Sequence, residues 1–300
     1  MQKVLLILNG SAGKGRIKSK TYDIIEQICK EHCSVTVVTV SPENTLESND
    51  IFQSDWKSFD KIICAGGDGT LNRTINAVVN KNLFNESVIG YIPSGSTNDF
   101  ARTVGIPKNF TKAIDAAING KVYKYDIGKF NDKHFNYVAA FGAFSAVSYT
   151  TNQSFKNVFG HAAYFLQVLN NFSENIKYKS YLKIKTDVFE EEGNYVFGAI
   201  HNATSVGGFN IGSKKNVMLN DGLFEILLIK APQNFSELSK IAQSLLNGDF
   251  DNPFLSFHQI KYAEIISTEE VAWTLDGEFG GKSKTVRFDV EPSAIQIMIP

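Results

Sequence analysis

The stretch from Lys61 to Asn72 reads KIICAGGDGTLN, and it decides the fold of the first part of the chain. Its opening residues form a short apolar run with β-branched side chains, which predicts a buried strand over Lys61 to Ala65. A glycine-rich turn follows this run. After the turn, apolar residues recur at helical spacing at Leu71, Ile75, Val78 and Val79. A strand that leads through glycines into an amphipathic helix indicates a parallel sheet covered by helices.

Runs of the same kind occur on both sides of this stretch. They are Val4 to Leu8, Val35 to Val40 and Val88 to Ile92. A second helix is predicted between the first two runs, where apolar residues recur at Ile24, Ile25, Ile28 and Cys29. We therefore expect residues 1–121 to form an α/β domain with a parallel sheet, in which the loops after the strands share one edge.

The pattern of apolar and polar residues changes after this domain. Residues 122–293 carry aromatic and β-branched runs that favour antiparallel strands, and we expect a β-sandwich domain there. The expected strands are Val122 to Phe130, Phe135 to Phe141, Tyr181 to Thr186, Tyr195 to Ile200 and Phe224 to Ile229. Helical spacing interrupts them at Ala162 to Asn171 and at Phe235 to Leu246. The last strand, Ala294 to Ile299, could return to the first domain, because its pattern does not say which sheet it joins.

The composition of the chain excludes some partners and locations. Acidic and basic residues nearly cancel in the 300 residues, whose formal net charge is −1, so we expect no nucleic acid partner. The three cysteines are too few for a disulfide framework and favour a reducing, cytoplasmic location. No apolar run approaches the roughly 18 residues of a spanning helix, so we expect any membrane contact to be peripheral.

The glycine-rich turn carries the strongest chemical signal. Gly66, Gly67 and Gly69 let a phosphate approach the backbone, and a helix that begins there offers N–H groups. Thr70 adds a hydroxyl. Asp68 is repelled by phosphate unless a cation lies between them or a proton is taken, so it predicts Mg²⁺ binding or acid–base chemistry. The alternative is a structural turn in which Asp68 only caps the helix.

Two other polar loops follow expected strands at the same edge of the sheet. The loop from Pro93 to Asp99 offers hydroxyls and amides to phosphate oxygens, and a capping turn with one of its last two residues as the N-cap is the alternative. The loop from Asn9 to Arg16 contains Gly13 and Lys14, but its spacing is not that of a Walker A loop. Its amides and its lysine can still bind phosphate, so the edge as a whole predicts a nucleotide site.

In these loops and beyond them, the chain resembles the diacylglycerol kinase catalytic family, which includes bacterial soluble lipid kinases and sphingosine kinases. The resemblance rests on five segments, which are Asn9 to Gly13, Gly66 to Asn72, Ser96 to Arg102, Tyr125 to Gly128 and Leu275 to Glu278. The last segment matches the Asp-Gly-Glu motif of the family. The resemblance implies an α/β ATP-binding domain similar to those of phosphofructokinases and NAD kinases, a β-sandwich domain, and ATP with Mg²⁺ in the cleft between them.

The loops and the resemblance together assign the candidate residues. Nucleotide contacts are expected at Asn9, Gly13, Lys14, Thr39, Gly66, Gly67, Gly69, Thr70, Ser96, Thr97 and Asn98. The resemblance implies catalytic roles for Asp68, Asp276 and Glu278, and metal binding by Asp68, Asp99, Asp126 and Asp221. Which carboxylate acts as the base stays open. In the family, an Asp-Asp-Gly triplet binds a structural Mg²⁺. In this chain Asn220 replaces the first aspartate of the triplet, so Asp221 is its one remaining carboxylate.

The implied activity is that of an ATP-dependent lipid kinase, which transfers the γ-phosphate to the hydroxyl of diacylglycerol and makes phosphatidic acid. The alternatives are a kinase of a sphingoid base, of a phosphatidylglycerol-like lipid or of NAD, and a nucleotide-binding or membrane-binding regulator without turnover. The expected partner is a lipid substrate at the membrane surface, which the chain reaches from the cytoplasm by peripheral contact. A homodimer is left open.

A lysine-rich segment, Lys177 to Lys185, alternates lysine with tyrosine and aliphatic residues. As a strand it would place its lysines on one face, which could rest on anionic lipid. The alternative is an edge strand whose charges prevent it from pairing with another chain.

Overall fold

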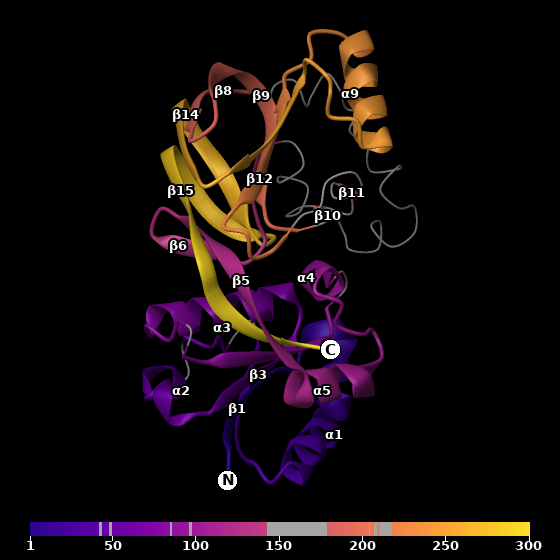
Figure 1. The fold of residues 1–300 in the computed structure, drawn as a ribbon, viewed down its shortest axis with the longest axis vertical. Coiled ribbons are helices and arrows are strands. Elements are labelled where there is room, and N and C mark those ends of the chain that lie inside the picture. The colour runs from indigo at the N-terminus through magenta and orange to yellow at the C-terminus, as the bar shows by residue number, and fades with distance from the viewer. Residues whose placement is uncertain are drawn as a thin grey trace. The chain divides into compact units, whose positions relative to one another are not determined.

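The computed structural model describes residues 1–41, 44–47, 50–84, 86–95, 98–142, 179–203, 205–206, 209–210 and 218–300 (Figure 1). The chain divides into two compact units, of which the first contains Met1–Ile127 and Pro292–Pro300 and the second contains Gly128–Glu291. The chain enters the second unit within strand β5 (Lys121–Phe130) and returns within strand β15 (Glu278–Ile299). The division therefore falls inside β5, after Ile127, whereas the sequence placed it after the first residue of this strand, Lys121.

A parallel sheet forms the centre of the first unit. Its strands are β1 (Lys3–Asn9), β2 (Ser34–Val40), β3 (Lys61–Gly66), β4 (Val88–Pro93) and the last residues of β15. They are ordered β15-β4-β3-β1-β2, and each neighbouring pair is parallel. Gln296 and Ile297 of β15 pair with Val88 and Ile89 of β4, so the tail of the chain joins this sheet.

Helices cover both faces of this sheet (Figure 1). Alternate residues of β1, beginning with Val4, share one core cluster with residues of α1 (Arg16–Lys30) and α5 (Phe110–Asn119). Helix α3 (Asp68–Asn80) packs against β3. Because side chains on both faces are buried, β1 reads as a continuous apolar run rather than as an alternating one.

The other helices of the first unit are short. They are α2 (Asp50–Gln53), α4 (Asp99–Thr103) and the 3-10 turns η1 (Ala12–Gly15) and η2 (Trp56–Ser58). Helix α5 was not predicted from the sequence, although Asn109 before it is a good N-cap residue and accepts the N–H of Lys112 at 3.1 Å.

The second unit is built from antiparallel strands. They are the end of β5, β6 (Lys133–Phe135), β7 (Val138–Gly142), β8 (Ser180–Thr186), β9 (Glu190–His201), β12 (Phe224–Lys230), β13 (Leu255–Ile260), β14 (Tyr262–Leu275) and most of β15. The short pair β10 (Ser205–Val206) and β11 (Phe209–Asn210) and the helix α9 (Phe235–Asn247) complete its described elements. No helix in the described part of the chain has the length and apolar composition needed to cross a membrane.

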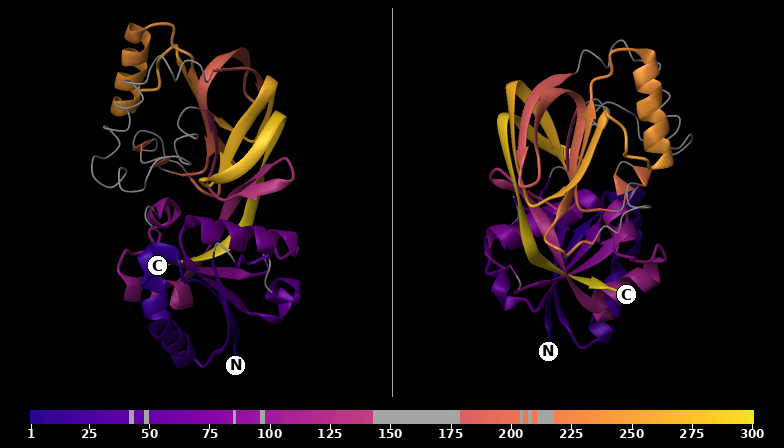
Figure 2. Two further views of the ribbon diagram at one scale, coloured as in Figure 1. Left: turned by 180° about the vertical axis from the view of Figure 1, so that it is seen from behind. Right: turned by 45° about the horizontal axis from the view of Figure 1, so that its top comes forward.

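The sheet of the second unit curls around the core of the unit. Hydrogen bonds follow the order β13-β12-β9-β7-β14-β15, and Figure 2 shows the long strands β14 and β15 side by side. The rings of Phe224 on β12 and Phe288 on β15 lie 5.3 Å apart, although β9, β7 and β14 stand between their strands. Phe135 on β6 contacts both rings, at 5.6 and 5.9 Å. The antiparallel layers expected from the sequence are thus formed by one curved sheet.

Strands β7 and β8 lie end to end between the same two neighbouring strands, β9 and β14. β9 pairs with β8 through Glu190 to Tyr195 and with β7 through Phe197 to His201. β14 also pairs with both of them. The chain leaves this position at Gly142, whose φ of 97° suits glycine, and returns to it at Ser180. The helix expected over Ala162 to Asn171 lies outside the described residues.

Strand β8 contains most of the lysine-rich segment, whose first two residues lie outside the described part of the chain. Lys183 and Lys185 are exposed on one face of β8, as expected. The edge-strand alternative is wrong, because β8 has hydrogen-bonded neighbours on both sides. Glu192 and Glu190 of β9 stand opposite the two lysines, and the Nζ of Lys183 lies 3.5 Å from a carboxylate oxygen of Glu192. This face therefore carries charges of both signs.

Candidate functional site

The loop after β3 is shaped for backbone contact. β3 ends at Gly66, Gly67 is the N-cap, and Asp68 is the first residue of α3. A Cβ atom on Gly66 would stand 2.6 Å from the Cβ of Thr70, so a larger residue does not fit. The N-cap residue Gly67 makes no side-chain cap bond to α3. Asp68 is therefore not the N-cap residue of α3 but the first residue of its first turn.

The loops after β3 and β4 pack backbone against backbone. Ser94 donates its N–H to the carbonyl oxygen of Gly66 at 2.8 Å, and a Cβ atom on Gly95 would stand 2.8 Å from the Cα of Gly67. Asn98 closes the second loop, because its Oδ1 accepts the N–H of Gly95 at 2.8 Å and its Nδ2 donates to the carbonyl of Gly95 at 2.9 Å. The Asn98 side chain thus shapes the loop and does not cap α4.

The loop after β1 is joined to the same place by a side chain. Asn9 donates from Nδ2 to the hydroxyl oxygen of Thr70 at 2.9 Å, and its Oδ1 accepts the N–H of Ser11 at 3.0 Å. Three loops that the sequence placed at one edge are therefore connected by direct contacts. We call this arrangement, made by Asn9, Gly66 to Thr70, Ser94, Gly95 and Asn98, the loop junction.

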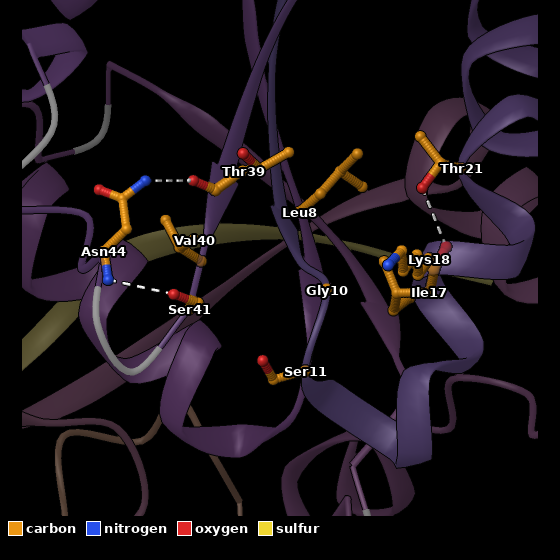
Figure 3. Close-up of a pocket in the computed structure, with 10 residues that line it drawn as sticks. All are labelled: Leu8, Gly10, Ser11, Ile17, Lys18, Thr21, Thr39, Val40, Ser41 and Asn44. Atoms are coloured by element: carbon orange, nitrogen blue, oxygen red, sulfur yellow. Dashed lines mark hydrogen bonds between the residues drawn. The ribbon is translucent and has the colours of Figure 1, made fainter.

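A pocket of about 370 Å³ lies beside the loop junction, at the carboxyl ends of β1 and β2 and next to α1 (Figure 3). Its lining residues are Leu8, Gly10, Ser11, Ile17, Lys18, Thr21, Thr39, Val40, Ser41 and Asn44. Asn44 fixes the segment after β2 that lines the pocket, because its N–H donates to the Oγ of Ser41 at 3.1 Å and its Nδ2 donates to the carbonyl of Thr39 at 3.3 Å. Thr39 had been expected from the family resemblance. Lys18 and Asn44 had not, because neither belongs to a motif.

Other expected nucleotide residues take the following places. Gly69 lies in the first turn of α3, and Gly13 and Lys14 lie in η1, the 3-10 turn between β1 and α1. Ser96 and Thr97 lie outside the described residues.

Two buried aspartates of the first unit have partners that the sequence did not reveal. Asp126 is fully buried on β5, and its Oδ1 accepts the N–H of Ser293 at 2.6 Å. Asp99 at the start of α4 has an oxygen 3.6 Å from Nη1 of Arg102. The Ser293 contact joins residues 167 positions apart, so no local pattern could have predicted it.

The expected metal residues do not form a cage. Among the described residues, no group of three or more His, Cys, Asp or Glu side chains is placed to hold a metal ion. Asp221 belongs to the second unit, where its Oδ1 accepts the N–H of Leu223 at 3.0 Å in a turn before β12. Mg²⁺ bound with a nucleotide needs only one or two protein carboxylates, because phosphates and water supply the other ligands. Asp68, beside the glycine backbones of the loop junction, fits that smaller role.

The Asp-Gly-Glu motif forms the tip of the β14–β15 hairpin in the second unit. Leu275 pairs with Glu278, so Asp276 and Gly277 are the two residues of the turn. Asp276 is 5% exposed, whereas Glu278 is exposed at the start of β15. The two carboxylates of the motif therefore have different surroundings.

Comparison with known proteins identifies related chains. Residues 3–130 match the diacylglycerol kinase catalytic domain. Diacylglycerol kinases of two Staphylococcus aureus strains, RF122 and MRSA252, are each 29% identical over 284 residues, which cover 94% of this chain and 87% of the relative. The crystal structure of a diacylglycerol kinase from Bacillus anthracis has a TM-score of 0.75 and 22% identity, over 100% of this chain and 97% of that chain. A second structure from that organism has a TM-score of 0.79 and 24% identity, over 100% and 95% of the two chains.

Proposed function

We propose, from the match of residues 3–130 to the diacylglycerol kinase catalytic domain, that this phosphotransferase uses ATP to phosphorylate the hydroxyl of diacylglycerol. The observation that carries the proposal is the loop junction, in which Asn9 bonds Thr70 and the backbones of Gly67 and Gly95 are in contact.

The loop junction suits the phosphates of ATP. Glycine backbones let phosphate oxygens reach N–H groups closely, and the first turn of α3 adds N–H groups that have no acceptor within the helix. The positive end of the helix dipole favours the same charge. The hydroxyl of Thr70, held by Asn9, supplies a further polar contact.

The neighbouring pocket suits the nucleoside part of ATP. Its volume of about 370 Å³ lies in the range of small-molecule sites. Leu8 and Val40 offer apolar surface to a base, while the hydroxyls of Ser11, Thr39 and Ser41 can bond a ribose or ring nitrogens. The pocket and the loop junction follow neighbouring strands of one sheet, as the two ends of a nucleotide require.

We assign to Asp68 the task of holding Mg²⁺ against the phosphates. Held there, Mg²⁺ would supply positive charge to offset that of the phosphates, which is the main electrostatic demand of phosphoryl transfer. The side chains and backbone of the chain then have to position the phosphates and the acceptor, and a carboxylate has to orient or deprotonate the acceptor hydroxyl. We assign that last task to the Asp-Gly-Glu motif.

The acceptor in this proposal is embedded in a membrane, so we propose that the chain acts from the cytoplasm by peripheral contact with the membrane surface. Sphingoid bases, phosphatidylglycerol-like lipids and NAD also present a hydroxyl group. The test therefore includes all of them.

The experiment uses the purified full chain, ATP labelled at the γ-phosphate and Mg²⁺. Mixed micelles carry dioleoylglycerol, sphingosine or phosphatidylglycerol, and NAD is offered in a separate reaction. We expect labelled phosphatidic acid as the main product. Phosphorylated sphingosine, phosphorylated phosphatidylglycerol or NADP as the main product would reassign the acceptor. No transfer to any acceptor would contradict the kinase proposal.

A further inference from the structure

The tip of the β14–β15 hairpin has a geometry that few residue pairs adopt. Asp276 and Gly277 both have positive φ, of 50° and 87°, between the paired residues Leu275 and Glu278. This is a two-residue hairpin loop, and Asp-Gly is one of the pairs that favour loops with positive φ at both positions. The turn sets where β15 begins and therefore where Glu278 stands.

The carboxylate of Asp276 is occupied by backbone donors. Its Oδ2 accepts the N–H of Asn136 at 2.6 Å, and its Oδ1 accepts the N–H groups of Tyr137 and Val138 at 2.9 and 3.0 Å. The backbone N–H of Asp276 donates to the carbonyl oxygen of Val138 at 2.8 Å. These bonds are buried, since Asp276 is 5% exposed.

The segment that Asp276 holds is itself fixed to the sheet. Val138 is the first residue of β7, which lies between β9 and β14. Asn202, directly after β9, donates its N–H to the carbonyl oxygen of Tyr137 at 2.9 Å. Asp276 thus ties the hairpin tip to the ends of two other strands.

A carboxylate in this position is poorly placed to take a proton from a substrate. Protonation would turn one of its oxygens into a donor that faces a backbone N–H, and buried N–H groups would lose their acceptor. Glu278 has no such constraint, because it is exposed on the strand that follows the turn.

We infer that Asp276 is a positioning residue, which holds the hairpin tip so that Glu278 is presented in one fixed place, and that Glu278 is the carboxylate of the motif that reacts with the acceptor hydroxyl. The role of Glu278 rests on the proposed kinase function, whereas the tie made by Asp276 does not. The aspartate of the motif then fixes position, the glycine permits the turn, and the glutamate reacts.

Backbone hydrogen exchange tests the tie without any substrate. In the wild-type chain, the N–H groups of Asn136, Tyr137 and Val138 should exchange slowly. Asp276→Asn preserves the size of the side chain and the tolerance of positive φ, but it replaces one acceptor oxygen by a donor, so it should speed this exchange at least about tenfold. Asp289→Asn removes an exposed carboxylate from β15, the strand that follows the turn, and should leave the exchange unchanged.

The pH dependence of lipid phosphorylation tests the division of roles. Asp276→Asn should lower kcat, but the remaining activity should keep the wild-type pH profile, because the reacting carboxylate is still present. Glu278→Gln should lower kcat about a hundredfold or more and change the profile, with exchange at residues 136–138 unaffected. Asp276→Glu keeps a carboxylate but moves it by one methylene, so positioning predicts that it performs no better than Asp276→Asn.

Fast exchange at residues 136–138 in the wild-type chain would overturn the tie, and this result does not require any variant to fold. Intact protection in Asp276→Asn, combined with a changed pH profile, would make Asp276 the reacting group instead. If no acceptor is phosphorylated at all, the proposed function fails, and the exchange result still decides whether the tie exists.

Discussion

The side-chain amide of Asn9 donates to the hydroxyl oxygen of Thr70 at 2.9 Å, although 61 positions separate the two residues. This bond joins the loop after β1 to the first turn of α3. Because the loop after β4 packs on the same turn through Gly95, one side chain and two glycine backbones hold three loops in register. The phosphate site in our account depends on that register.

Asn9→Ala should weaken ATP binding by about tenfold, because the loop after β1 loses its bond to α3. Calorimetry with ATP and Mg²⁺ measures the change. Asn80→Ala, at the exposed end of α3, is the matched control and should bind ATP as the wild-type chain does. Equal affinities for the two variants would remove Asn9 from the site.

Gly95→Ala should lower the free energy of unfolding by about 1 to 3 kcal/mol, because the added Cβ would stand 2.8 Å from the Cα of Gly67 and force the two loops apart. Gly10→Ala is the control, since a Cβ there meets nothing within 4 Å. Thermal melting of both variants makes the comparison. If Gly95→Ala has the same melting temperature as Gly10→Ala, the two loops do not need their close contact.

Acid should weaken the second unit through His201, which is fully buried on β9 with Nδ1 3.9 Å from a carboxylate oxygen of Glu225. Burial lowers the pKa of His201 to about 4 from an ordinary value of 6.5. Between these two pH values the unfolded chain binds a proton that the folded chain does not, so stability falls as the pH falls from 6.5 to 4. The loss should approach about 3 kcal/mol.

Denaturant titrations across this pH range can follow Trp273, the tryptophan of the second unit, in a Trp56→Phe background. His201→Gln should flatten the fall in stability, whereas His32→Asn, at an exposed turn, should preserve it. A fall that is the same in both variants would assign the acid sensitivity to other groups.

Lys183→Glu should leave binding to anionic vesicles unchanged. The face of β8 that carries this lysine also carries Glu192 and Glu190 of β9, so its charges largely cancel. A lysine that docks on anionic lipid contributes about 1 kcal/mol, and its reversal would weaken binding at least about fivefold. Vesicle sedimentation of Lys183→Glu and Glu192→Lys at low salt makes the comparison. If Lys183→Glu loses vesicle binding and Glu192→Lys does not, this face of β8 is the membrane contact.

The parts of the fold that could be predicted are those with a local signal. β1 and β3 are buried on both faces, so their apolar runs are continuous, and the glycines after β3 mark the turn into α3. β14 was missed because the polar residues Ser267 to Glu270 interrupt its pattern at an irregularity in its pairing with β15. The short helix α5 was missed because alanines form much of its buried side.

In the candidate site, too, the parts with a local signal could be predicted and the contacts between distant residues could not. The loop junction could be predicted because its glycines, hydroxyls and amides stand in short motifs directly after strands. The partners of Asp126 and Asp276 could not, because these bonds join residues 167 and up to 140 positions apart. The resemblance marked both aspartates as functional, and only their hydrogen bonds show that each holds a distant segment of backbone.

Phosphate transfer by Asp68→Asn tests the central claim most directly. The substitution removes a negative charge at the start of α3 and keeps the shape of the side chain. The wild-type chain should transfer the γ-phosphate of ATP to dioleoylglycerol in mixed micelles, and the variant should lose at least about a hundredfold in turnover while its melting temperature stays close to the wild-type value. Turnover in Asp68→Asn equal to that of the wild-type chain, or a wild-type chain that transfers no phosphate to lipid, would contradict the account.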